Sequence, residues 1–277
     1  MPDDVQMDDD VPLRQPLIEP PAVINVAEVD PAALTLPLDP YELSPQELFT
    51  ISRARLTLLL DCLRNRGIQI SIPEARPIPW SRHEQRYGLT DLDRAARFGY
   101  HVPEIMRRPP LREPPMPPEI ADDCLALALR QLNHGVPDGW QPHLAHRLSM
   151  RTHLLSRQDS RVREVFGSWS ARMRAAGLDY PDPMAANNDP AFSTDEPTEQ
   201  EIATAVADVR CKRAVGVIPV WAAVEAAYQE LVLDQHRDEL ELVRRALDIR
   251  LANARRAQQR PAGRTRPGPT GVEPTCR

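Results

Sequence analysis

Residues 207–229 read ADVRCKRAVGVIPVWAAVEAAYQ, and this stretch decides how the second half of the chain folds. Small and aliphatic residues recur in it at helical spacing, but Gly216 and Pro219 interrupt them. After Pro219 about forty residues run to Gln259 without another glycine or proline. The stretch therefore predicts two helices with a break near Gly216, the second of them a long helix over residues 217–258.

The predicted long helix would exceed a small domain in length, because forty helical residues span about 60 Å. Part of it must project from the core or pack against another helix, from this chain or from a second copy. Aliphatic residues recur along it about every seven positions, which is the spacing of a coiled-coil seam. The residues of this predicted interaction seam are Leu233, Leu240, Val243 and Leu247.

Helix signals of the same kind recur through the rest of the chain. A capping box at Ser44 and Glu47 predicts a helix that continues to Arg66. A second capping box, Thr198 with Glu201, opens the helix that precedes the break. Apolar periodicity predicts further helices over residues 119–134, 142–158 and 160–176, and shorter ones within 81–101. The expected fold class is mainly α: an irregular helical bundle with a long C-terminal helix and disordered termini.

Prolines divide the chain, because the sequence holds 30 of them and they cluster. Residues 1–43 combine runs of aspartate with prolines and show no apolar periodicity, which predicts a disordered acidic, proline-rich arm. Residues 44–258 form the predicted helical domain, with a proline-rich connector at 103–118 and a loop at 181–197. Residues 259–277 are predicted to form a disordered basic tail.

Charge is unevenly placed along the chain, whose net charge is −6. Residues 1–50 hold eleven acidic residues and one base, Arg14, whereas from Arg250 onward seven arginines face Glu273 alone. The basic tail would suit nucleic acid or anionic lipid, so a basic-tail binder is one alternative function. The negative net charge and the lack of aromatic residues in the tail argue against nucleic acid.

The sequence predicts neither a membrane span nor an export signal. It contains no run of about 18 apolar residues, the length that a spanning helix needs. Its first thirty residues lack the basic start and apolar stretch that are typical of a secretory signal. We therefore expect no transmembrane segment, and a cytoplasmic location is the alternative to the one implied by the resemblance described below.

Signatures of nucleotide-dependent and metal-dependent enzymes do not occur in the sequence. His143 and His146 lie one helical turn apart, and with Trp140 they mark the place where an unrecognised hydrolase or transferase site would lie. His153 is nearly three turns from His143 and therefore too distant to share a metal with it, even if Cys124 approached. We predict no metal, no cofactor, no catalytic residue and no small-molecule substrate.

The carboxylates of the predicted helices receive no chemical role. Asp208 and Glu225 lie on either side of the break at Gly216. Acidic residues of this kind are ordinary on solvated helix faces. We expect both carboxylates to face solvent.

The cysteines at 62, 124 and 211 are predicted to be structural. A nucleophilic cysteine needs a base that faces it, whereas the basic residues next to Cys211 in sequence point away from it on a helix. Cys62 and Cys211 lie on apolar helix faces, where a thiol packs as a small hydrophobic group. In an oxidising compartment two cysteines would pair, and the sequence leaves the pairing among Cys62, Cys124, Cys211 and Cys276 open.

Several short motifs occur together between about residues 45 and 255. They are the Cys-x4-Gly helix end from Cys62 to Gly67, RYGLTD followed by GYH, the Cys124 helix, the WSA-x-M helix end, and ADVRCK with the following W and VEAAYQ. In combination they resemble uncharacterised actinobacterial proteins that are secreted or lipid-anchored at the cell envelope. The resemblance implies that location but no activity. It also implies a cysteine at position 172, so Arg172 leaves Cys124 or another cysteine without its expected partner.

We therefore expect a non-enzymatic, envelope-associated structural or interaction protein that acts through its helical surfaces. The expected partner is a protein, either a second copy of the chain or another helix, bound along the interaction seam. One alternative is a cytosolic enzyme with a site near His143 and His146. The other is a protein whose basic tail binds nucleic acid or anionic lipid.

Overall fold

The computed structural model describes residues 19–24, 30–31, 33–70, 82–83, 86–102 and 118–259. Helices make up most of this part and no strand is formed within it, so the predicted mainly α fold is confirmed. The helices are α1 (Pro45–Asn65), α2 (Leu92–Phe98), α3 (Pro118–Leu132), α4 (Leu144–Gln158), α5 (Ser160–Ala175), α6 (Pro183–Asn187), α7 (Glu199–Val215), α8 (Val217–Gln235) and α9 (Arg237–Gln258). The described residues also form the 3₁₀ helices η1 (Asp39–Tyr41) and η3 (Pro190–Phe192).

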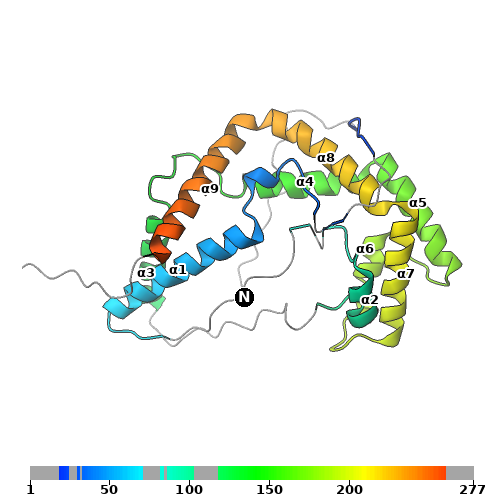
Figure 1. The fold of residues 1–277 in the computed structure, drawn as a ribbon, viewed down its shortest axis with the longest axis horizontal. Coiled ribbons are helices and arrows are strands. Elements are labelled where there is room, and N and C mark those ends of the chain that lie inside the picture. The colour runs from blue at the N-terminus through cyan, green and yellow to red at the C-terminus, as the bar shows by residue number, and fades with distance from the viewer. Residues whose placement is uncertain are drawn as a thin grey trace, which may run out of the picture.

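The helices are arranged as an arch (Figure 1). α8 and α9 make its span, and α4 lies along the inner side of α8 and also contacts α9. At one end α1 and α3 pack against each other and against α9. At the other end α5 packs against α7 and α8, while α2 and α6 pack against α7. Segments distant in sequence therefore meet at both ends of the arch.

Local signals set the helix starts and stops that the sequence predicts. Glu47 N–H donates to Ser44 Oγ at 3.2 Å, and Ser44 N–H donates to Glu47 Oε2 at 2.9 Å, which completes the capping box of α1. Gly216 separates α7 from α8 with a φ of 72°, in the left-handed region that glycine adopts most easily. The break predicted near Gly216 is thereby confirmed.

The second predicted capping box is only half formed. Thr198 Oγ1 accepts from Glu201 N–H at 3.1 Å, as a helix cap does. The Glu201 side chain, however, does not turn back to Thr198 but accepts a hydrogen bond from Tyr100 N–H. The predicted return bond is therefore wrong, because a contact distant in sequence recruits this carboxylate.

The single long helix predicted over residues 217–258 is wrong, because the chain bends at His236. α8 ends at Gln235 and α9 begins at Arg237, and His236 between them has a φ of −121°, outside the helical range. The bend allows α8 to pack against α4 and α5 while α9 packs against α1 and α3. Neither glycine nor proline marks this position, so it carries no local signal.

The predicted interaction seam lies inside the protein. Leu240, Val243 and Leu247 expose 0%, 1% and 4% of their surface, and Leu233 packs against them partly buried. Their neighbours are the apolar residues of α4 and a leucine that precedes α1, Leu38. The expectation of an outward contact surface is wrong, since these segments of the same chain already cover the seam.

Disorder throughout residues 1–43 is also contradicted in the part of this segment that the structure describes. Leu36 and Leu38 are buried, and Leu38 N–H donates to Gln229 Oε1 at 3.0 Å. Leu38 has helical backbone angles, with φ −82° and ψ −8°, in the turn that leads into η1. Residues 1–18 lie outside the described residues.

The other predicted linkers have different outcomes. The loop at 181–197 contains α6 and η3, each begun by an aspartate cap and a proline in the first turn. Of the connector at 103–118 only Pro118, the first residue of α3, is among the described residues. The tail after α9 is described up to Gln259, and residues 260–277 lie outside the described part.

Candidate functional site

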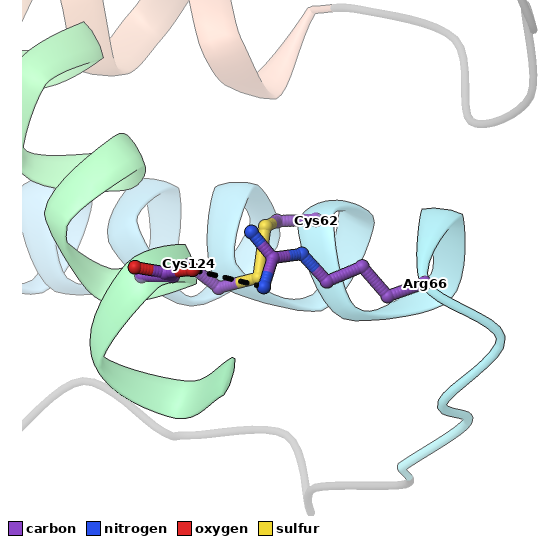
Figure 2. Close-up of a disulfide and its surroundings, with 4 residues drawn as sticks. Cys62, Arg66 and Cys124 are labelled. Atoms are coloured by element: carbon purple, nitrogen blue, oxygen red, sulfur yellow. Dashed lines mark hydrogen bonds and ion pairs between the residues drawn. A yellow bond between two sulfur atoms is a disulfide. The ribbon is translucent and has the colours of Figure 1, made fainter. Parts of the chain in front are cut away.

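Cys62 and Cys124 form a disulfide that joins α1 to α3 (Figure 2). Their Cα atoms are 5.6 Å apart, and the bond spans 62 residues of sequence. Both cysteines are buried in a small apolar cluster with Leu63. Beside the bond, Arg66 Nη1 lies 3.2 Å from Asp123 Oδ2, and Figure 2 shows the Arg66 side chain extended across the disulfide. The structure thus selects one of the pairings that the sequence leaves open.

Cys211 is the cysteine without a disulfide within the described part of the chain. It is half-buried on α7 against the core that contains Trp169 and Trp221. Burial raises the pKa of its thiol, and the adjacent Arg172 guanidinium opposes that rise. The position at which the resemblance implies a cysteine therefore adjoins Cys211. The unpaired cysteine among the described residues is thus Cys211 and not Cys124, whose partner is Cys62.

The histidines of the alternative enzyme site lie at the surface of the protein. His143 precedes α4 and is exposed, and the His146 side chain is 61% exposed, with its Nδ1 3.5 Å from Glu42 Oε1. His153 lies two turns further along α4, at a different group of partners. Trp140 packs instead against an arginine of α9, 5.4 Å from its ring centroid. Within the described residues, no three His, Cys, Asp or Glu side chains are placed to hold a metal ion.

The residue that gathers the most buried polar side chains is Glu225, in the middle of α8. Its Oε1 accepts from both Arg86 Nε, at 2.8 Å, and Arg86 Nη2, and from Gln229 Nε2 at 3.1 Å. Its Oε2 accepts from the Tyr87 hydroxyl at 3.1 Å and from His153 Nδ1 at 3.0 Å. These five residues are named the Glu225 cluster. The carboxylate itself has no exposed surface.

Glu225 is ionised in spite of its burial. Burial acts to raise its pKa, but the hydrogen bond from His153 and the charge of Arg86 outweigh burial and lower the pKa below its ordinary value. Burial acts to lower the pKa of the Arg86 guanidinium, but the charge of Glu225 outweighs burial and raises that pKa. Burial and the same carboxylate raise the pKa of Tyr87, so its phenol stays neutral. The cluster is a buried Glu225–Arg86 ion pair to which Tyr87, Gln229 and His153 add hydrogen bonds.

The Glu225 cluster fastens segments that are far apart in sequence. Arg86 Nη2 donates to the carbonyl oxygen of Ser149 on α4 at 2.9 Å. Gln229 accepts from Leu38 N–H, so the segment before α1 is held by the same group. A buried ion pair in which every acceptor is hydrogen-bonded fixes the relative position of the segments that carry it. Removing one partner of such a pair is strongly destabilising. The cluster therefore sets how α4, α8 and two connecting segments fit together.

Aromatic rings enclose the His153 side of the cluster. The His153 ring stacks on Trp221, with centroids 5.0 Å apart and planes inclined by 20°. Tyr87 and Phe166 meet Trp221 edge-on at 5.0 and 5.1 Å. Trp221 Nε1 donates to Ser156 Oγ at 2.9 Å, which satisfies the indole.

A partly exposed group of ionisable residues lies beside the Glu225 cluster, where η1 meets residues 82–83. Asp39 Oδ2 lies 2.9 Å from His83 Nε2, and Arg82 Nη1 is 3.4 Å from both Asp39 Oδ1 and Glu42 Oε2. Burial acts to raise the pKa of Asp39, but its bonds to His83 and to a backbone N–H lower it overall. Glu42 raises the pKa of His146. This group holds the segment before α1 on the body of the protein.

The single lysine of the chain forms a second buried polar group, the Lys212 cluster. Lys212 Nζ donates to Asp208 Oδ2 and to the carbonyl oxygen of Leu89, both at 2.9 Å. Asp208 also accepts from Trp169 Nε1 at 3.1 Å and from the Tyr100 hydroxyl at 3.2 Å. The expectation that Asp208 and Glu225 face solvent is wrong, because both are fully buried and bonded to partners distant in sequence.

The chemistry of the two clusters is that of structural ion pairs. Glu225 orients His153 as a carboxylate orients an imidazole in general-base catalysis. Here, however, donors occupy both carboxylate oxygens and Trp221 covers one ring face. One signal in the sequence would have found the cluster: Glu225 and Gln229 stand four residues apart in the otherwise apolar first part of α8.

Comparison with known proteins finds no matching family model, no matching curated protein and no matching solved structure. Among the described helices none alone has the length and apolar character needed to cross a membrane. α7 and α8 satisfy that test of length and composition only as a pair, bent by 66°.

Proposed function

We propose that this protein is a non-enzymatic structural or interaction protein of the cell envelope or the secreted space, as its resemblance to actinobacterial envelope proteins implies. The observation that carries the proposal is the Cys62–Cys124 disulfide. Disulfides form and persist in oxidising compartments and are rare among cytosolic proteins. A buried disulfide between two core helices therefore supports a location outside the cytosol.

The use of the buried ionisable groups supports the structural part of the proposal. Glu225 and Asp208 are each bonded to a basic residue and to aromatic donors. Bonds of this kind fix elements in position, which is the requirement of a protein that presents surfaces at a set spacing. The arch in Figure 1 holds two helical ends apart in that manner.

We propose that exposed leucines of α1 and α3 are the contact residues. Leu48 on α1 and Leu125 and Leu127 on α3 expose 51%, 37% and 37% of their surface. The aliphatic seam of α8 and α9 is covered within the chain, so these leucines take its place as the apolar contact residues. The partner is a protein that buries them.

The location is tested by counting thiols. Protein purified without reductant and alkylated after unfolding is expected to carry label on Cys211 and no label on Cys62 or Cys124. Peptide mass spectrometry identifies the labelled positions. Label on all four cysteines would remove the support for an oxidising compartment.

The contact surface is tested by light scattering over a range of protein concentrations. If the partner is a second copy of the chain, the wild-type protein associates and the Leu125→Glu/Leu127→Glu variant does not. Arg130→Glu, an exposed change on the same helix, serves as the control and is expected to behave as the wild type. Association that persists in the double variant would place the contact elsewhere.

A further inference from the structure

The chain that leaves α2 is fastened to α7 by a buried acid. Glu201, fully buried in the first turn of α7, accepts through Oε1 from Tyr100 N–H at 2.8 Å and lies 2.7 Å from His101 Nδ1. Gly99 allows this approach, because its φ is +55° and a Cβ there would lie 2.5 Å from Glu201 Oε1. On the other side of the ring, His101 Nε2 lies 2.7 Å from the carbonyl oxygen of Thr194.

Both ring nitrogens of His101 therefore face acceptors. A backbone carbonyl has no proton to donate, so the contact with Thr194 requires an N–H at Nε2. The contact between Nδ1 and a carboxylate oxygen requires a second proton. A neutral imidazole has only one N–H, so the His101–Glu201 pair holds one proton more than a neutral histidine beside an ionised glutamate. The buried carboxylate stabilises that proton on the ring as a charge-assisted hydrogen bond.

We propose that His101 and Glu201 form a proton-operated latch. While the proton is present, the latch holds the end of α2 and the segment around Thr194 on the start of α7. When the proton leaves, the neutral ring keeps one N–H, so either Nδ1 presents a lone pair to the Glu201 carboxylate or Nε2 presents one to the Thr194 carbonyl. The two segments then separate from α7.

Two pairs of ionisable groups lie on the elements that pack around the latch. On α7, Asp208 pairs with Lys212 at 2.9 Å. After α5, the Tyr180 hydroxyl donates to Asp189 Oδ2 at 2.7 Å, and burial with that bond raises the pKa of Tyr180 to about 12. His101 is the one histidine among these described groups, and histidine is the side chain whose ordinary pKa lies near neutral pH.

The latch closes on the acidic side and opens on the alkaline side. In an unfolded chain a histidine loses its second proton near a pH of about 6.5, whereas the folded pair retains it to higher pH. The stabilisation is complete below that value and is lost as the pH rises through the titration of the folded pair. Asp195 and Glu196 near Thr194 favour the proton, and Arg97 at the end of α2 opposes it. All three side chains are exposed, so solvent screens their influence.

NMR on the full-length protein tests the proton count. At a pH of about 7.5 the His101 ring is expected to show two protonated nitrogens, which an exposed histidine does not show at that pH. A ring with one unprotonated nitrogen under these conditions would overturn the proposal. This measurement uses the unmodified protein, so it does not depend on whether a variant folds.

Amide hydrogen exchange tests the release. After correction for intrinsic exchange rates, the protection of the α2 amides is expected to fall about tenfold or more between pH values of about 6 and 9. The reason is that each unit by which folding raises the pKa of the pair shifts the opening equilibrium tenfold. His101→Gln has an N–H but no proton to lose, so its α2 protection is expected to be independent of pH. His143→Gln, at an exposed position before α4, is the control and retains the fall. Constant protection in the wild type, or the same fall in His101→Gln, would contradict the latch.

Discussion

The two ends of the arch are held together by different means. Where α1, α3 and α9 meet, the core consists of aliphatic side chains and alanines, and the Cys62–Cys124 bond lies beside it. Where α5, α7 and α8 meet, Trp169 and Trp221 dominate the core and border two buried ion pairs. Small side chains bury little apolar surface, so the disulfide adds much to the stability of that end. At the other end, the large aromatic core encloses charged groups whose hydrogen bonds are all made. The chain therefore stabilises one end with a covalent bond and the other end with buried ion pairs.

The largest effect is expected from breaking the electrostatic end. Glu225→Gln keeps the shape of the side chain but leaves Arg86 buried without a counter-charge, which costs about 3–5 kcal/mol. The free energy of unfolding in urea, followed by circular dichroism, measures the loss. Glu230→Gln, an exposed change on the same helix, is expected to alter stability by less than about 0.5 kcal/mol. A loss under about 1 kcal/mol for Glu225→Gln would mean that the cluster does not hold this end together.

Acid is expected to weaken the same end, by an amount that approaches the effect of Glu225→Gln. The pKa of Glu225 is lowered from the ordinary 4.5, so its stabilisation is present above that value. It is lost as the pH falls through the lower value of the folded state. Urea unfolding of the wild type and of Glu225→Gln at several pH values compares the two, and the variant is expected to lose less. Equal losses would show that Glu225 does not cause the acid sensitivity.

Between the two ends, the buried seam offers a test of packing. Leu240→Ala is expected to destabilise the protein by about 2–5 kcal/mol, because it leaves a cavity between α9 and α4. Leu125→Ala, on the exposed side of α3, is expected to change stability by less than about 0.5 kcal/mol. Thermal and urea unfolding measure both. A neutral Leu240→Ala would restore the outward seam that the heptad spacing predicts.

The covalent end is expected to lose about 2–4 kcal/mol when the disulfide is removed. In a Cys62→Ala/Cys124→Ala variant, hydrogen exchange should show the loss of protection in α1 and α3, while α7 keeps its protection. Cys211→Ala is the matched control, because Cys211 forms no disulfide in the described part of the chain. Uniform loss of protection over all helices would show that the two ends are not separately held.

The smallest expected effect is at the start of α1. Ser44→Ala removes the capping box and is expected to cost about 1 kcal/mol. Thr57→Ala, inside the same helix, serves as the control, because its hydroxyl bonds only to the carbonyl oxygen of Arg53 one turn earlier. Urea unfolding separates the two. Equal effects would mean that the cap adds nothing beyond ordinary helix propensity.

Helix starts and breaks that depend on residues a few positions apart can be predicted from the sequence. The cap at Ser44 and the break at Gly216 involve residues a few positions apart, and both are found in the structure. The bend at His236 has no such signal, since the packing of two helices on different partners produces it. Glu225 was expected in solvent because its partners Arg86 and His153 lie 139 and 72 residues away. Pairing over such distances depends on the completed fold.

The bend at His236 makes the arch a lever. α9 is 22 residues long, so its far end lies about 33 Å from the bend. A rotation of about 10° at that point would move α1 and α3 by about 6 Å relative to α8. Because α4 packs against both α8 and α9, the span between the two ends depends on that packing as well as on the bend at His236.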